Sequence, residues 1–249
     1  MKRPLILIAL ISTGIGLWAQ GSPVIRNTIP QWLVPLREAV YEQRLTANQV
    51  RPLYETAKAA AQSNATGAAL NVALSRCEYF MGRALHYENR TSEATVHYEE
   101  GMRLAESALA ASPSADAWVM RAENLSQRCA IGPWTYTAAN GLNVERFAKN
   151  GLALNSRNAA AQILVAARWV YAPAPFHDHR RGIRMMTDIL QNGDVGKDDI
   201  FNIYFGIGWG HMQLRNYADA RTWFGRAQEI YPTNKSVAEQ LNNDRLRNL

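Results

Sequence analysis

Residues 201–232, FNIYFGIGWGHMQLRNYADARTWFGRAQEIYP, contain the pattern that decides the fold. Apolar residues recur in this stretch every three or four positions, in two successive segments, which is the spacing of one face of an α-helix. The small residues Gly208, Ala220 and Ala227 lie where two antiparallel helices would cross closely. Pro232 ends the second segment, because proline cannot continue a helix. The stretch therefore predicts a tightly packed helical hairpin.

The same stretch resembles one unit of the tetratricopeptide repeat (TPR), counted with Phe201 as position 1. It departs from the TPR pattern at position 11, where His211 replaces the usual aromatic residue. The resemblance implies helix pairs that stack into an α-α superhelix and bind along a concave face, which the first helix of each pair forms. The residues that carry it are Tyr204, Ile207, Gly208, Tyr217, Ala220, Phe224, Ala227 and Pro232.

The helical period continues along the chain from about residue 30, and no alternating strand pattern interrupts it. An earlier copy of the repeat begins near Ser75, with Gly82 and Tyr98 at the positions of Gly208 and Phe224. We therefore expect an all-α fold, an α-α superhelix of about four TPR-like helix pairs. The expected segments are a signal peptide at 1–20, N-terminal helices at 21–65, and a repeat domain at 66–249 that packs with them as one unit. Within that domain, degenerate pairs lie at 114–155 and 158–191, an enlarged loop at 172–178 and a capping helix at 234–248.

The first residues have the features of an export signal. A positive start at residues 1–3 precedes an apolar run at 4–18, which is short for a membrane span of about 20 residues. We expect cleavage near Ala19 and a periplasmic or secreted protein, with an uncleaved N-terminal anchor as the alternative. Removal of Lys2 and Arg3 would lower the formal charge of +6 by two, which is too small an excess to predict nucleic-acid binding.

The sequence offers no motif of a known catalytic or cofactor site, so we expect no enzyme activity, no cofactor and no metal. His177 and His179 could bind a metal ion, but no third and fourth ligand is evident. Asp198 and Asp199 are adjacent and should therefore point in different directions on a helix. An enzyme built on a helical-repeat scaffold remains the alternative.

The two cysteines, Cys77 and Cys129, are expected to be buried free thiols. The repeat register places them roughly 16 Å apart along parallel helices. A disulfide needs Cα atoms within about 7 Å.

The resemblance to TPR proteins also predicts which side chains face the concave groove. Arginine offers a planar fork for a carboxylate, and aromatic rings offer stacking area at little entropic cost. A groove of this kind would hold a protein partner, a peptide terminus or a small organic anion. The alternative is that many of the aromatic residues belong to the core. The candidates are Arg76, Tyr79, Arg83, His86, Tyr87, Asn124, Arg128, Tyr171, Asn202, Phe205 and Trp209.

Two apolar segments between helices are further candidates for contact with a partner. Residues 131–136 place Trp134 and Tyr136 in a predicted connection between helices, and residues 171–176 form a proline-rich loop. These segments either contact a partner or fold back as lids on the core.

The arrangement also resembles, more loosely, the exported TPR proteins associated with tripartite (TRAP-type) solute transporters of spirochaetes and other bacteria. The features that carry this resemblance are a long second helix over 98–111 and a proline-rich loop before a helix over 171–183. It implies a periplasmic accessory protein with a bore through its helices and a solute-binding protein as partner. The chain lacks the lipid-attachment cysteine of such proteins. The alternative is an envelope-assembly adaptor that uses its outer surface and loops.

Overall fold

The computed structural model describes residues 29–247, and within them every regular element is a helix. The predicted signal peptide at 1–20 lies outside these residues. Apart from one isolated bridge between Asn158 and Asp194, the described part of the chain contains no β-structure, which confirms the all-α prediction. The helices are α1 (Val34–Glu42), α2 (Ala47–Asn64), α3 (Gly67–Tyr87), α4 (Thr91–Ala111), α5 (Ala115–Ile131), α6 (Trp134–Leu154), α7 (Ala159–Tyr171), α8 (His179–Asn192), α9 (Lys197–Gln213), α10 (Tyr217–Ile230), α11 (Lys235–Leu241) and α12 (Asp244–Arg247), after a 3-10 turn at Gln31–Leu33.

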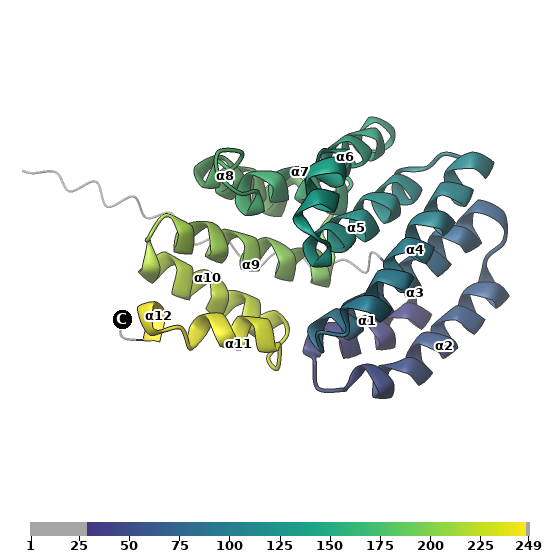
Figure 1. The fold of residues 1–249 in the computed structure, drawn as a ribbon, viewed down its shortest axis with the longest axis horizontal. Coiled ribbons are helices and arrows are strands. Elements are labelled where there is room, and N and C mark those ends of the chain that lie inside the picture. The colour runs from purple at the N-terminus through teal and green to yellow at the C-terminus, as the bar shows by residue number, and fades with distance from the viewer. Residues whose placement is uncertain (1–28, 248–249) are drawn as a thin grey trace, which may run out of the picture.

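The helices pack as consecutive pairs, and the pairs stack side by side (Figure 1). The pairs α3–α4, α5–α6, α7–α8 and α9–α10 are the four that the sequence predicts, and α1–α2 precede them. The first helices α3, α5, α7 and α9 contact one another in that order, so they form the inner layer of the stack. No helix of the described chain is long and apolar enough to cross a membrane.

Glycines allow the close crossing of the paired helices. A Cβ atom on Gly82 of α3 would lie 2.5 Å from the Tyr98 ring of α4, and one on Gly208 of α9 would lie 2.9 Å from the Phe224 ring of α10. Both distances are too short for a real carbon atom. In both hairpins a glycine of the first helix therefore faces an aromatic ring of the second helix, at the same repeat positions, as their common register predicts.

Two details of the helix assignment differ from the predictions. Helix α6 begins at Trp134, because Pro133 precedes its first turn as the N-cap residue; Trp134 and Tyr136 are therefore helical rather than in a connecting loop. The capping element is two short helices, α11 and α12, in place of one. The two cysteines are both free and buried, as expected.

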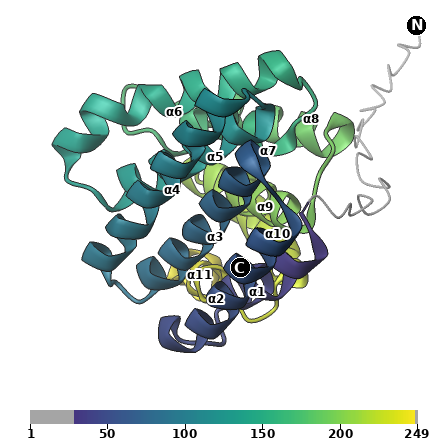
Figure 2. The ribbon, with the colours of Figure 1, turned by 90° about the vertical axis from the view of Figure 1, so that its right-hand side faces the viewer.

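The ends of the stack meet at Tyr41 of α1, so the helices form a closed ring (Figure 2). The Tyr41 ring stacks on Tyr231 at 4.9 Å between ring centroids and meets Phe201 of α9 edge-on at 5.4 Å. Asn202 donates a hydrogen bond to the Tyr41 hydroxyl, and Asn234 donates one to its carbonyl. The concave face is therefore enclosed by the two ends of the described helix stack, which an open TPR groove would not be.

Candidate functional site

The inner face of the ring has two ends of different chemistry. The N-terminal parts of α5, α7 and α9 line a cavity of about 210 Å³ together with the middle of α3. The C-terminal ends of α3, α7 and α9 carry aromatic side chains instead. Carboxylates are favoured near helix N-termini and disfavoured near C-termini, because of the helix dipole. We call these regions the acidic cavity and the aromatic end.

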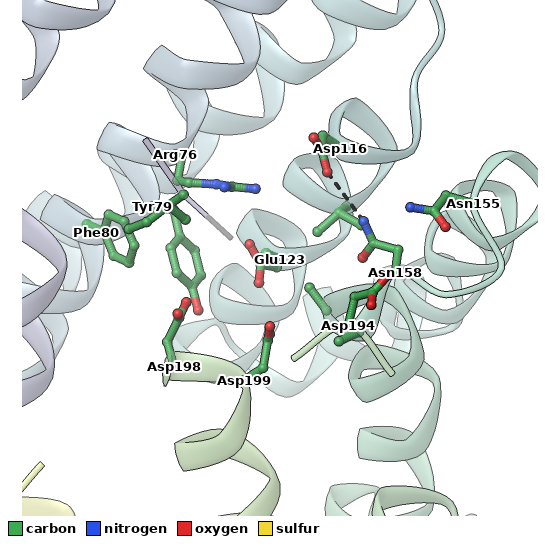
Figure 3. Close-up of a pocket in the computed structure, with 14 residues that line it drawn as sticks. Arg76, Tyr79, Phe80, Asp116, Glu123, Asn155, Asn158, Asp194, Asp198 and Asp199 are labelled. Carbon is green, nitrogen blue, oxygen red and sulfur yellow. Dashed lines mark hydrogen bonds between the residues drawn. The ribbon is translucent and has the colours of Figure 1, made fainter. Parts of the chain in front are cut away.

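The acidic cavity contains five carboxyl groups and one arginine. Asp116 accepts a hydrogen bond from Asn158 at 3.3 Å, and Asp194 pairs with Arg157 at 3.1 Å. The other three carboxyl groups project into the cavity with Arg76 across from them (Figure 3). The residues that line the cavity are Ile29, Arg76, Tyr79, Phe80, Asp116, Val119, Glu123, Asn155, Asn158, Ala159, Ala160, Asp194, Asp198 and Asp199.

Two carboxyl groups of this cavity, those of Glu123 and Asp199, have raised pKa values. Burial raises the pKa of Glu123 to about 8, and the nearby Asp198 and Asp199 contribute to the increase. Burial and the adjacent Asp198 likewise raise the pKa of Asp199 to about 7. Asp199 also accepts the Gly196 N–H at 2.8 Å, which caps α9. Contrary to the expectation for adjacent helical residues, Asp198 and Asp199 both line the same cavity.

Arg83 lies in the centre of the inner face, between the two ends. It is only 9% exposed, and its guanidinium lies 4.4 Å from the centroid of the Tyr41 ring. It donates hydrogen bonds to the hydroxyls of Tyr79, at 3.2 Å, and of Tyr87. Its Nε atom has no hydrogen-bond partner in the described chain. Arg83 is thus enclosed by tyrosines, although the sequence predicted that it would face an open groove. Both terminal nitrogens of its guanidinium already donate hydrogen bonds within the protein.

The aromatic end brings together four of the predicted residues. The rings of His86 and Tyr87 stack at 6.2 Å, and those of Tyr171 and Trp209 lie 6.4 Å apart. Tyr171 is 46% exposed, although its hydroxyl lies over Gly206 of α9. Burial and the charge of Arg83 lower the pKa of His86, so this histidine is neutral at physiological pH. The aromatic end therefore offers accessible rings on the inner face.

Two other predicted residues, Asn202 and Phe205, pack between helices of the closed stack. Asn202 is bonded to Tyr41, as described above, and the Phe205 ring meets Phe224 edge-on at 5.3 Å. Phe205 therefore fits the alternative prediction, that some of the candidate aromatic residues belong to the core.

Three predicted residues lie away from the inner face. Asn124 is fully buried, where it donates hydrogen bonds to Ser75 Oγ and to the Met120 carbonyl and packs against Gly101. A groove position for Asn124 is therefore wrong.

Arg128 is also not free, because it pairs with Glu99 at 3.0 Å and covers the Tyr136 ring at 4.2 Å. Trp134 is 79% exposed, and it begins α6, which is the outer helix of its pair.

The residues that the sequence analysis missed are the acids of the cavity, above all Glu123. Glu123 immediately precedes Asn124 on α5, so it is offset by one position from the predicted binding pattern. In a degenerate helix pair the repeat register is not accurate enough to decide which of two adjacent residues faces the inner side. The adjacent pair Asp198-Asp199 was the one feature of the sequence that pointed to an acidic site. It contributes to the cavity because it lies in the first turn of α9.

The described residues contain no group of three or more histidine, cysteine or acidic side chains arranged to hold a metal ion. The rings of His177 and His179 stack at 4.2 Å without a third candidate ligand beside them.

The architecture defines this chain as an all-α helical-repeat protein. Residues 201–234 match the family model of the tetratricopeptide repeat and cover most of the helical hairpin α9–α10. Such repeats support a role in protein–protein interaction or scaffolding, and a fold of this class is typical of non-enzymatic scaffolds. A search of curated proteins found no match to the chain.

Proposed function

We propose that this protein is an exported scaffold that holds a segment of a protein partner at the aromatic end of its inner face. The observation that supports this most strongly is the exposure of Tyr171, a residue that is 46% exposed beside Trp209. Exposed aromatic rings supply contact area at little entropic cost, and Tyr and Trp are over-represented among the residues that dominate binding energy.

Export and the identity of the partner belong to the same proposal. The positively charged start and apolar run of residues 1–18 support export. The loose resemblance to the TPR proteins of TRAP-type transport systems supports a periplasmic solute-binding protein as the partner, with this chain as an accessory component.

A small anion fits the inner face less well than a protein partner. The acidic cavity would offer an anion a single arginine, Arg76, among five carboxyl groups. Arg83 is enclosed by tyrosine rings and donates to two of their hydroxyls. A protein segment, in contrast, needs apolar contact area, which the aromatic end provides.

A second candidate function is an adaptor that uses the outer surface. Trp134 and Leu142 of α6 are both strongly exposed, as is Phe176 in the loop between α7 and α8. Exposed apolar side chains of this size mark contact surfaces when they cluster. The two candidates therefore differ in which aromatic residue a partner covers.

Affinity capture of partners from envelope extracts tests the proposal. We expect Tyr171→Ala to weaken binding of the partner by about 30-fold or more, because loss of a central aromatic anchor costs about 2 kcal/mol or more at an interface. Trp134→Ala is the matched control on the outer face and should leave capture unchanged. Undiminished capture by Tyr171→Ala, with loss in Trp134→Ala, would support the adaptor. A solute-binding protein as the captured partner would support the transport role.

A further inference from the structure

The acidic cavity presents two carboxyl groups that the fold leaves without a cation. Glu123 makes no hydrogen bond or ion pair with any described residue, although it lies among charged neighbours. Asp199 is only 8% exposed and uses one oxygen to cap α9, while its other oxygen has no hydrogen-bond partner in residues 29–247. Both side chains point into the cavity (Figure 3).

The arginines around the cavity do not neutralise these two groups. Arg37 forms an ion pair at 3.5 Å with Asp198, the third carboxyl group that projects into the cavity. Arg76 extends from the opposite wall and makes no ion pair with a described residue (Figure 3). A buried carboxylate without a partner is costly, and burial accordingly raises the pKa of Glu123 to about 8 and that of Asp199 to about 7. A ligand with a positive charge would remove that cost.

We propose that the acidic cavity binds a small molecule with a primary ammonium group, which donates hydrogen bonds to Glu123 and Asp199. An ammonium group has three donors, which suits two carboxylates that line the same cavity. The cavity volume of about 210 Å³ suits a small aliphatic amine or amino acid rather than a larger ligand. In an amino acid, the carboxylate would face Arg76. This inference goes beyond the proposed partner binding, because the cavity lies at the opposite end of the inner face.

Binding of the ammonium group releases protons near neutral pH. Glu123 and Asp199 give up the protons that they hold in the empty cavity, because their charged forms pair with the ligand. The charged groups that act on Glu123 are Arg76 and Arg83 of α3 and Asp198 and Asp199 of α9. The heat of binding measured at pH 7 therefore depends on the ionisation enthalpy of the buffer.

Isothermal titration calorimetry of the purified protein with cadaverine, L-lysine and glutarate tests the proposal. We expect both amines to bind with proton release and the dicarboxylate not to bind. Glu123→Gln keeps the shape of the side chain, and Asp199→Asn keeps an acceptor for the α9 cap. Each substitution should weaken amine binding by about tenfold or more. Glu106→Gln, exposed on α4, should bind as the wild type does.

Arg76→Ala separates the two kinds of amine. It should weaken L-lysine, which has a carboxylate, and leave cadaverine unchanged or tighter. Absence of amine binding, binding of glutarate as tightly as of cadaverine, or unchanged amine binding in Glu123→Gln would each overturn the proposal. Partner capture by Glu123→Gln should remain intact, so a failure here is distinguishable from a failure of the proposed function.

Discussion

Replacement of Tyr41 by alanine is expected to lower the free energy of unfolding by about 3–5 kcal/mol, the range for truncation of a large buried aromatic side chain. Tyr41 is 1% exposed and lies where both ends of the helix stack meet. Its ring contacts Tyr231, Phe201 and the guanidinium of Arg83. Truncation therefore leaves a cavity at the closure of the ring and uncovers a buried cation. Chemical denaturation measures the loss.

Tyr41→Phe is the matched control for this prediction. It keeps the ring and its packing and removes only the hydroxyl, which accepts a hydrogen bond from Asn202 at 3.1 Å. We expect a loss of about 1 kcal/mol, the usual net contribution of one hydrogen bond. A change of less than 1 kcal/mol for Tyr41→Ala would show that the ring does not close through this residue.

Gly82→Ala should be the second most damaging substitution, with a loss of about 1–3 kcal/mol from overpacking. The added methyl group would lie 2.5 Å from Cε1 of Tyr98, which is fully buried and has no room to move. The intrinsic preference of a helix for alanine over glycine, about 1 kcal/mol, opposes this loss and does not cancel it. Thermal or chemical denaturation gives the net value.

Gly225→Ala is the matched control, and it should raise the free energy of unfolding rather than lower it. Gly225 lies within α10, and a Cβ atom added there would meet nothing within 4 Å. The substitution should therefore stabilise the protein by up to about 1 kcal/mol through helix propensity alone. Equal effects of the two substitutions would contradict the close crossing of α3 and α4.

The repeat register made much of the fold predictable. Gly82 and Gly208 mark the crossings, and Tyr98 and Phe224 fill the space beside them, because those contacts join residues within one hairpin. The enlarged loop before α8 and the free thiols follow from the same register. Local spacing is sufficient for features of this kind.

Closure of the ring could not be predicted in that way. Tyr41 and Asn202 are 161 residues apart, and no spacing within a helix pair relates them. The register assigned Arg83 to the concave face, but it could not reveal that Tyr41 covers it. Asn124 shows the same limit on a smaller scale, since its neighbour Gly101 belongs to the preceding helix pair.

In the proposed function, the inner face at Tyr171 is the surface that binds a protein partner. Site-specific photo-crosslinking in envelope preparations tests it directly, with a benzophenone side chain placed at position 171 and, as the outer-face comparison, at position 134. We predict a discrete crosslinked adduct with a protein partner from position 171 and none from position 134. An adduct from position 134 alone would contradict the claim and favour the outer surface.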